Sequence, residues 1–114
     1  MTVEIVAFHP DRLPAIADLW VEAWTEAYPA IDFTARRDWF CDRIAAMAEG
    51  GTTVLVALRG GETAGFITVD VAAGWIDQML VGRAHQGSGA AATLMAEAKR
   101  LRPEGLRLDV NADN

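Results

Sequence analysis

The chain has 114 residues, of which 52% are hydrophobic and 23% are charged, a composition typical of one globular domain and not of a disordered chain. Its formal net charge of −6 argues against binding to nucleic acid or to an anionic membrane through bulk charge. A single cysteine excludes an intrachain disulfide, and the two distant histidines are not spaced as a metal-binding pair. No apolar run approaches the roughly 20 residues that span a bilayer, and the first residues do not resemble a signal peptide. We therefore expect a reducing, cytoplasmic setting.

Residues 2–48 are predicted to form one strand and two helices. Apolar residues alternate over 2–8, which predicts a strand, and they recur at helical spacing over 13–27 and over 35–48. Pro29 is expected to end the first helix, because the residue before a proline avoids the helical conformation. Thr34 is expected to cap the second helix. The second helix region carries three arginines that are expected to form a solvated face: Arg36, Arg37 and Arg43.

Residues 52–111 are predicted to form four strands and one helix. Runs rich in β-branched residues predict strands over 52–58 and 63–71, joined by a hairpin turn. A strand over 75–81, a helix over 89–102 and a strand over 106–111 follow. The full order, β-α-α-β-β-β-α-β, predicts an α/β (α+β) fold in which helices flank a mixed, mostly antiparallel sheet.

The loop between the strand over 75–81 and the helix over 89–102 carries most of the information about function. It reads Val81-Gly82-Arg83-Ala84-His85-Gln86-Gly87-Ser88-Gly89-Ala90-Ala91-Ala92. Glycines let a backbone approach a ligand closely, and the N–H groups at the start of a helix favour an anion. Arg83 and His85 are expected to add positive charge. The segment therefore predicts a phosphate or pyrophosphate site, and the alternative is a tight connection whose glycines serve only the turn.

Three phosphate-binding motifs can be compared with this loop. A P-loop requires Lys followed by Ser or Thr after its last glycine, and Ala90 and Ala91 stand there instead. The dinucleotide-binding pattern G-x-G-x-x-[GA] fits residues 87–92, with Asp109 near the expected downstream distance. However, five residues separate the end of the strand at Val81 from the first glycine of that pattern. The preceding hairpin also suits a parallel, doubly wound sheet poorly.

The third motif covers Gln86-Gly87-Ser88-Gly89-Ala90-Ala91, which fits [QR]-x-x-G-x-[GA]. This is the acetyl-coenzyme A motif of the GNAT superfamily of N-acetyltransferases, which the sequence resembles over essentially its whole length. Residues 76–81 and 106–110 resemble the fourth and fifth strands of that family, and Trp24-x-x-x-Tyr28 is common among similar sequences. The resemblance implies one GNAT-like domain over 1–114 whose C-terminal α-β-β elements are absent.

The resemblance implies a site for acetyl-CoA and no metal. The backbone of Met79, Leu80 and Val81 would hydrogen-bond the pantetheine arm, and a backbone N–H of Met79 or Leu80 would stabilise the oxyanion. Loop amides would hold the pyrophosphate. The residues implied in the loop are Gln86, Gly87, Ser88, Gly89, Ala90, Ala91 and Ala92, with Asn114 as a further coenzyme contact.

The implied reaction is direct attack of an amine on the acetyl thioester, which requires a group that takes a proton. Asp109 stands where relatives often carry a carboxylate that acts as the base. Asp77 and Gln78 are alternatives, and strict alternation predicts that one faces the cleft and the other the opposite side. Asp70 is a weaker candidate, and its ordinary interpretation is a solvated strand residue.

The acceptor would be a small-molecule or peptide amine, and neither a nucleic acid nor a membrane is expected as a partner. Trp24 and Tyr28 would line its pocket, although aromatic residues at this spacing are also typical of a core. The net charge of −6 favours a cationic acceptor. Cys41 is interpreted as a packing residue. The open edge of the last strand, 106–111, predicts a homodimer.

Two other functions fit the same sequence. The first is a GNAT-like module that binds coenzyme A or a partner without catalysing transfer. The second is a dinucleotide-binding fragment, which the G-x-G-x-x-[GA] match favours.

Overall fold

The computed structural model describes residues 2–108, and its five strands form one sheet in the order β1-β2-β3-β4-β5. β1 to β4 are antiparallel neighbours, whereas β5 is parallel to β4. The strands are β1 (Val3–Ala7), β2 (Thr53–Arg59), β3 (Glu62–Asp70), β4 (Trp75–Val81) and β5 (Arg107–Leu108). The mixed, mostly antiparallel sheet confirms the predicted fold class. It differs from the parallel, doubly wound sheet of a dinucleotide-binding fragment.

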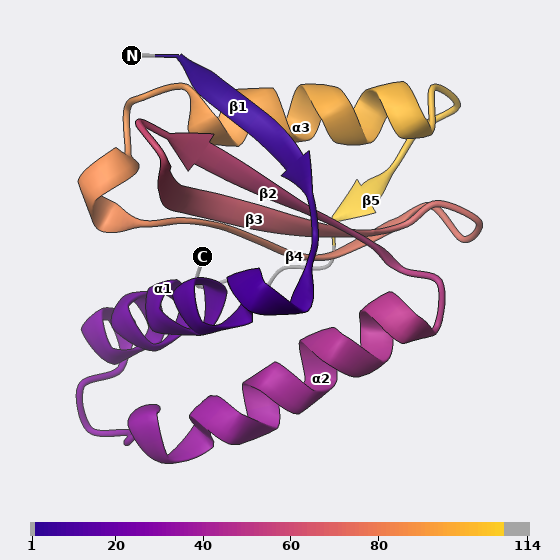
Figure 1. The fold of residues 1–114 in the computed structure, drawn as a ribbon. Coiled ribbons are helices and arrows are strands. Elements are labelled where there is room, and N and C mark those ends of the chain that lie inside the picture. The colour runs from indigo at the N-terminus through magenta and orange to yellow at the C-terminus, as the bar shows by residue number, and fades with distance from the viewer. Residues whose placement is uncertain (1, 109–114) are drawn as a thin grey trace.

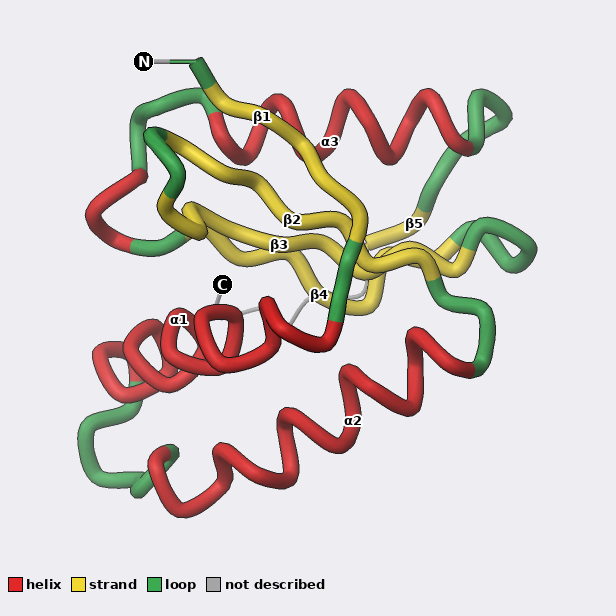
Figure 2. Tube along the Cα trace, viewed as in Figure 1, coloured by secondary structure: helices red, strands yellow, loops and turns green. Residues whose placement is uncertain are grey.

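The helices cover both faces of this sheet (Figure 1). They are α1 (Leu13–Ala27), α2 (Arg37–Glu49) and α3 (Ala90–Leu101), with short 3-10 turns η1 (Pro10–Arg12), η2 (Thr34–Arg36) and η3 (Arg83–His85). Figure 2 shows the yellow strands between α3 on one side and α1 and α2 on the other. Within the described part of the chain, no helix is long and apolar enough to cross a membrane.

The sheet separates two hydrophobic cores because successive side chains of a strand point to opposite faces. On the α1 and α2 side, Phe66 of β3 lies edge-on to Phe40 of α2 with ring centroids 6.0 Å apart, and Phe40 stacks on Trp20 of α1 at 4.6 Å. On the other side, Ile67 of β3 packs in one cluster with Leu94 of α3. β3 has six consecutive buried residues and therefore contributes to both cores.

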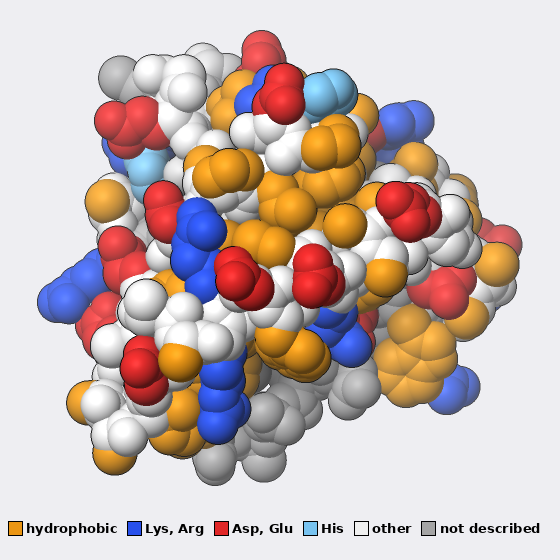
Figure 3. Space-filling view, turned by 60° about the horizontal axis from the view of Figure 1, so that its bottom comes forward, with side chains coloured by type: hydrophobic (Ala, Val, Ile, Leu, Met, Phe, Trp, Pro, Cys, Tyr) orange, Lys and Arg blue, Asp and Glu red, His pale blue; other side chains and the backbone are white. Residues whose placement is uncertain are grey.

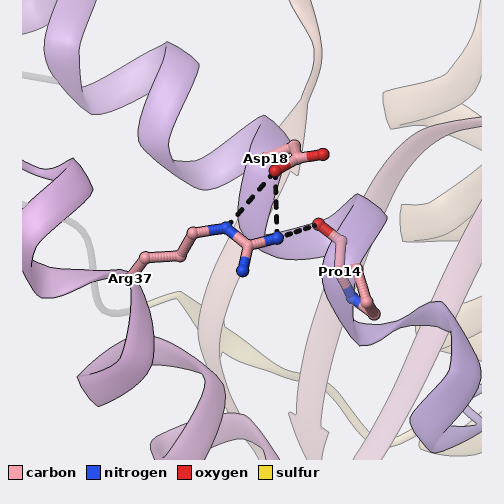
Figure 4. A network of polar contacts seen from close by, with 3 residues as sticks. All are labelled: Pro14, Asp18 and Arg37. Atoms are coloured by element: carbon pink, nitrogen blue, oxygen red, sulfur yellow. Dashed lines mark hydrogen bonds and ion pairs between the residues drawn. The ribbon is translucent and has the colours of Figure 1, made fainter.

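An arginine joins the two helices that lie on the same face of the sheet (Figure 4). Arg37 at the start of α2 donates from Nε and Nη2 to Oδ1 of Asp18 on α1, at 3.3 and 3.0 Å. Its Nη2 also donates to the carbonyl oxygen of Pro14 at 3.0 Å. These contacts tie the beginning of α2 to the first half of α1, so the two helices hold a defined spacing over the sheet.

The cap predicted for the second helix is wrong. Thr34 lies inside η2, and the side chain that accepts a hydrogen bond there is Asp32, whose Oδ1 receives the N–H of Ala35 at 3.2 Å. The Asp32 carboxylate accepts the N–H three residues on, a local bond that aspartate favours, so the capping side chain lies two residues before Thr34. The helical region therefore starts as a 3-10 turn before α2.

The core between α2 and β3 predicts a large effect of one substitution. Phe40→Ala should lower the free energy of unfolding by about 3–5 kcal/mol, because Phe40 is fully buried between two aromatic rings. Its neighbour Trp39 is 58% exposed, so Trp39→Ala should cost less than about 1 kcal/mol. Urea unfolding of both variants followed by circular dichroism checks this difference, and equal losses would contradict the assignment of Phe40 to the core.

The last predicted strand is only partly inside the described residues. Arg107 and Leu108 form β5 and pair with Trp75 and Ile76 of β4. Leu106 precedes β5 and is not part of it, whereas residues 109–111 of the predicted strand, including Asp109, and the predicted coenzyme contact Asn114 lie outside the described residues. The predicted association of two chains along this edge stays a prediction.

Candidate active site

A β-bulge in β4 sets the orientation of the residues next to the predicted cleft. Val69 of β3 pairs with Ile76 and Thr68 pairs with Gln78, so Asp77 is an extra residue in β4. The Gln78 N–H donates to the Thr68 Oγ1 at 2.9 Å, which gives this fully buried threonine a hydrogen-bond partner. The bulge therefore interrupts the regular alternation at the centre of the strand.

This bulge overturns the prediction that Asp77 and Gln78 face opposite sides of the sheet. Ile76 and Met79 both pack in the core under α3, so the two residues between them lie on the face of α1 and α2. Asp77 contacts α2 directly, because its Oδ2 accepts a hydrogen bond from Nη2 of Arg43 at 2.9 Å. The strand thus brings a carboxylate and an amide to the same side.

The same strand directs alternate backbone groups toward its outer edge. The N–H of Gln78 points to β3, and so does the N–H of Gly82, which donates to the carbonyl oxygen of Ala64 at 2.8 Å. Backbone groups alternate with a period of two, so Leu80 also points to β3. The N–H and C=O groups of Met79 and Val81 therefore point to the edge where β5 begins.

The loop after β4 ends in a helix start with exposed amides. The first intrahelical bond of α3 runs from the N–H of Thr93 to the carbonyl oxygen of Gly89 at 2.9 Å, so the N–H groups of Ala91 and Ala92 have no intrahelical partner. Gly89, which precedes the helix, has a φ of +91°, and a Cβ built on Gly87 or Gly89 would meet open space. The segment thus presents backbone donors beside open space.

Ser88 holds the shape of this turn from within. Its Oγ donates to the carbonyl oxygen of His85 at 2.5 Å and accepts the N–H of Ala90 at 3.4 Å. Of the predicted motif residues, Gln86, Gly87 and Gly89 are exposed, Ser88 is half-buried, and Ala90 is buried against the sheet. The residues expected to bind a pyrophosphate therefore lie together at one turn.

The expectation that two basic side chains add positive charge to this turn needs correction. His85 is only 8% exposed, with its Nε2 lying 3.6 Å from Oε2 of Glu62 and its Nδ1 3.5 Å from Nη1 of Arg59. Arg83 forms an ion pair with Glu26 of α1 at 2.9 Å. Both basic side chains are thus engaged with neighbouring acidic groups, because turn η3 directs them toward the β2–β3 hairpin and toward α1.

A groove of about 720 Å³ lies between α1, α2 and β4, and we call it the α1–α2–β4 groove. Its aromatic wall is formed by Trp20, Trp24, Phe33 and Trp39. Four consecutive residues of β4 also line it, from Asp77 to Leu80, together with Leu108 of β5. On the face that Figure 3 brings forward, hydrophobic side chains are interspersed with charged ones of both signs.

The groove collects several of the predicted site residues. Trp24 lines it, whereas Tyr28 is not among its lining residues in the described part of the chain and stacks on Trp24 with ring centroids 5.7 Å apart. Gln78 also lines it. Asp70 lies elsewhere, at the β3–β4 turn, where its Oδ1 accepts the N–H of Ala73 at 3.0 Å. Its observed role is therefore to close that turn.

The sequence interpretation missed three groove residues on the helical segment of η2 and α2. Arg36, Trp39 and Arg43 all line the groove, and both arginines are exposed, in agreement with the solvated face predicted for them. Their spacing of three and four residues places them along one side of the helix, and this spacing was the available signal. Arg36 lies over the ring of Phe33 at 5.7 Å, and Arg43 over that of Trp39 at 6.0 Å.

Cys41 lies on α2 beside these residues but packs against the core. Burial raises the pKa of its thiol from the usual 9.0, with Arg37 acting in the opposite direction. A thiol that keeps its proton is a poor nucleophile. The interpretation of Cys41 as a packing residue is consistent with this environment.

The raised pKa of the Cys41 thiol predicts a pH effect on stability. Above pH 9 the unfolded chain loses the thiol proton before the native chain does, so the free energy of unfolding falls as the pH rises further. Cys41→Ser removes the titrating group, and its stability relative to the wild type should improve between pH 7 and pH 10. Urea unfolding of both proteins at these two pH values measures the difference. An unchanged difference would contradict a raised thiol pKa.

Comparison with known proteins decides between the motifs. A model of the acetyltransferase (GNAT) family matches residues 13–114, which is most of the chain. The chain belongs to this family. A search of proteins with curated functions finds no significant match. Family membership supports transfer of an acyl group from coenzyme A as the general activity.

Several solved structures share the fold of this chain. The PaiA N-acetyltransferase of Thermoplasma acidophilum, in complex with coenzyme A, is 18% identical with a TM-score of 0.76, and the match covers 100% of this chain and 82% of that one. YjaB of Escherichia coli, in its apo form, is 17% identical with a TM-score of 0.74, covering 100% and 75%. A ribosomal-protein-alanine N-acetyltransferase of Brucella melitensis is 20% identical with a TM-score of 0.65, covering 97% and 82%. At sequence identities this low, the similarity shows that this chain and these proteins share a fold.

Proposed function

We propose that this GNAT protein moves an acetyl group from acetyl-CoA to a primary amine by direct attack. The observation that carries the proposal is the set of backbone donors in the family's motif region that are unpaired within residues 2–108. The set has two parts, the outer edge of β4 at Met79 and Val81 and the first amides of α3, and the loop between them uses most of its N–H groups internally. In the same region the groove supplies room for an acceptor beside β4.

The described residues fit the coenzyme. An extended pantetheine arm can pair with Met79 and Val81 as an added strand would, because their N–H and C=O groups point away from β3. The pyrophosphate can accept from the N–H groups of Ala91 and Ala92, where the helix dipole favours an anion, and the preceding turn would add the N–H groups of its two glycines. The glycines matter here, since a Cβ on Gly87 or Gly89 would project into the open space in front of those amides. Asn114 remains a proposed additional contact.

Acetyl-CoA supplies an activated acetyl thioester, whose C–S bond breaks as the acceptor nitrogen forms its bond to the carbonyl carbon. The N–H of Met79 is the donor best directed to stabilise negative charge on the carbonyl oxygen. The N–H of Leu80, the other predicted donor, points to β3 by the same alternation. Met79 is therefore the proposed oxyanion donor.

The acceptor ammonium must first lose a proton, which we assign to the carboxylate of Asp109. Asp77 is less suited, because its carboxylate already accepts a hydrogen bond from Arg43 at 2.9 Å. Gln78 lines the groove and its amide cannot take up the proton, so its proposed role is to hydrogen-bond and orient the acceptor. Trp24 would contact the acceptor from the opposite wall.

Two measurements test this function separately. Isothermal calorimetry with coenzyme A and with NAD should show binding of coenzyme A alone, and a preference for NAD would favour the dinucleotide-binding alternative. Release of free thiol from acetyl-CoA in the presence of an amine, followed with a thiol reagent, should show transfer. Binding of coenzyme A without transfer to any amine would favour the module that binds without catalysis.

A further inference from the structure

We propose that the amine accepted by this protein also carries a carboxylate and an aromatic ring, as a free aromatic amino acid does. This inference rests on the proposed acetyl transfer and names the acceptor class for the α1–α2–β4 groove. The groove adjoins the proposed coenzyme edge, because Met79 and Leu80 of β4 are among its lining residues. A molecule held there is therefore next to the proposed reaction centre.

The charge of the groove is opposite to that of the whole chain. Its charged lining residues among those described are Arg36, Arg43 and Asp77, a formal balance of +1 within a protein whose net charge is −6. Arg43 is already paired with Asp77 at 2.9 Å. Among residues 2–108, no carboxylate oxygen lies within 4.0 Å of a guanidinium nitrogen of Arg36. Arg36 is thus the cation at the groove that can receive a carboxylate of the acceptor.

Arg36 is held in position for such a role. Its guanidinium lies 5.7 Å from the centre of the Phe33 ring, which is itself only 5% exposed and packs edge-on against Trp20 at 5.6 Å. A cation placed over a fixed aromatic ring keeps its donors free for a second partner. A planar guanidinium can bind a carboxylate with two parallel hydrogen bonds.

The aromatic wall defines the body of the acceptor. Trp20, Trp24 and Phe33 form one packed group, with ring centroids between 5.6 and 6.5 Å apart, and Trp39 adds a ring that is 58% exposed. Trp20 and Phe33 are only 6% and 5% exposed and hold Trp24 in place, so Trp24 and Trp39 are the rings that offer flat apolar surface to an aromatic partner. The size of the groove, about 720 Å³, is in the range that binds a small molecule.

Asp77 lies on the β4 wall of the groove and offers a negative charge to the ammonium of the acceptor. The bulge of β4 turns its carboxylate into the groove, where one oxygen accepts from Arg43 and the group still carries its negative charge near Gln78. An acceptor ammonium is attracted to this wall, while its carboxylate is attracted to Arg36. A polyamine has no group for Arg36, so the proposed acceptor follows the local charge of the groove and not the net charge of the chain.

Binding of three probes to the wild-type protein tests the proposal, with the fluorescence of the groove tryptophans as the readout. The probes are L-phenylalanine, 2-phenylethylamine, which lacks only the carboxylate, and spermidine. L-Phenylalanine should bind at least about tenfold more tightly than 2-phenylethylamine, because only L-phenylalanine can form the charge-assisted hydrogen bonds to Arg36, and a pair of such bonds contributes affinity of this order. Arg36→Gln should remove this preference, and Arg36→Lys should retain part of it. Arg100→Gln, on α3 at the other face of the sheet, is the matched control and should leave it unchanged.

Coenzyme A binding, measured by calorimetry on the same samples, separates the two proposals. Equal or tighter binding of 2-phenylethylamine or spermidine would overturn the acceptor class, and so would the absence of binding by all three probes. In either case, normal coenzyme A affinity would leave the proposed transferase function standing. Loss of the carboxylate preference in Arg36→Gln with unchanged coenzyme A affinity would support the acceptor class. A wild type that binds L-phenylalanine but no coenzyme A would count against the transferase function and, with it, against the role of L-phenylalanine as an acceptor, while the carboxylate preference of the groove would stand.

Discussion

Gly89→Val should weaken coenzyme A binding by about 100-fold, the largest effect we expect from a single substitution in the loop. A valine at a φ of +91° is strained, so the turn must change its conformation, and the amides at the start of α3 then lose their common direction. The added side chain would also project into the open space beside those amides. Loss of one or two charge-assisted hydrogen bonds to a phosphate costs about 1.5–3 kcal/mol each.

Gly51→Val is the matched control for this substitution. Gly51 has a φ of +100° and open space around its Cβ position, but it lies in the turn after α2. Both variants should lose about 1–2 kcal/mol of stability, the cost of a left-handed conformation for an L-residue. Only Gly89→Val should lose coenzyme A affinity in calorimetry. Equal affinities in the two variants and the wild type would remove the loop from the proposed binding site.

The local patterns of the sequence predict the elements well where one periodicity dominates. The helix over 13–27 and the strand over 75–81 have the same bounds in the structure, because apolar spacing and flanking turn residues agree there. The start of the second helix differs, since Asp32 rather than Thr34 accepts the first available amide. Side-chain competition over a few residues decides such boundaries, and residue type alone does not rank the competitors.

The site is less predictable because it depends on pairing between distant segments. The bulge at Asp77 arises from the register between β3 and β4 and from the hydroxyl of Thr68, which lies ten residues before Gln78. The pattern of β4 by itself predicts plain alternation, which placed Asp77 and Gln78 on opposite faces. Likewise, the burial of His85 depends on the β2–β3 hairpin that it contacts.

The motif predicted the position of the loop but not its electrostatic environment. The glycines and the helix start lie where the pattern placed them, because these are local backbone properties. Two further positive charges lie away from the loop, in the α1–α2–β4 groove, at Arg36 and Arg43 of the helical segment of η2 and α2. In the sequence these arginines resemble any solvated helix face, and only the packing of α2 beside α1 and β4 identifies them as groove residues.

Asp109→Asn should lower the rate of acetyl transfer by on the order of 100-fold at pH 7, with coenzyme A affinity little changed. Asparagine has nearly the same size as aspartate but cannot take the proton from the acceptor ammonium. The deficit should shrink as the pH rises, because a growing fraction of the acceptor amine is already deprotonated. Initial rates of thiol release between pH 6 and pH 10, at saturating acetyl-CoA, measure both effects.

Asp70→Asn provides the control for this experiment, because Asp70 is exposed and its carboxylate closes the β3–β4 turn. Its transfer rate should stay within about a factor of two of the wild type, as expected for a surface position that takes no part in proton transfer. If Asp109→Asn behaves in the same way as this control, the proton must pass to another group. Asp77 would then be the carboxylate to test, and its pairing with Arg43 predicts that Asp77→Asn changes the acceptor KM together with kcat. A deficit in Asp109→Asn that is constant from pH 6 to pH 10 would also contradict the assignment, because loss of a base must matter less once the amine has lost its proton.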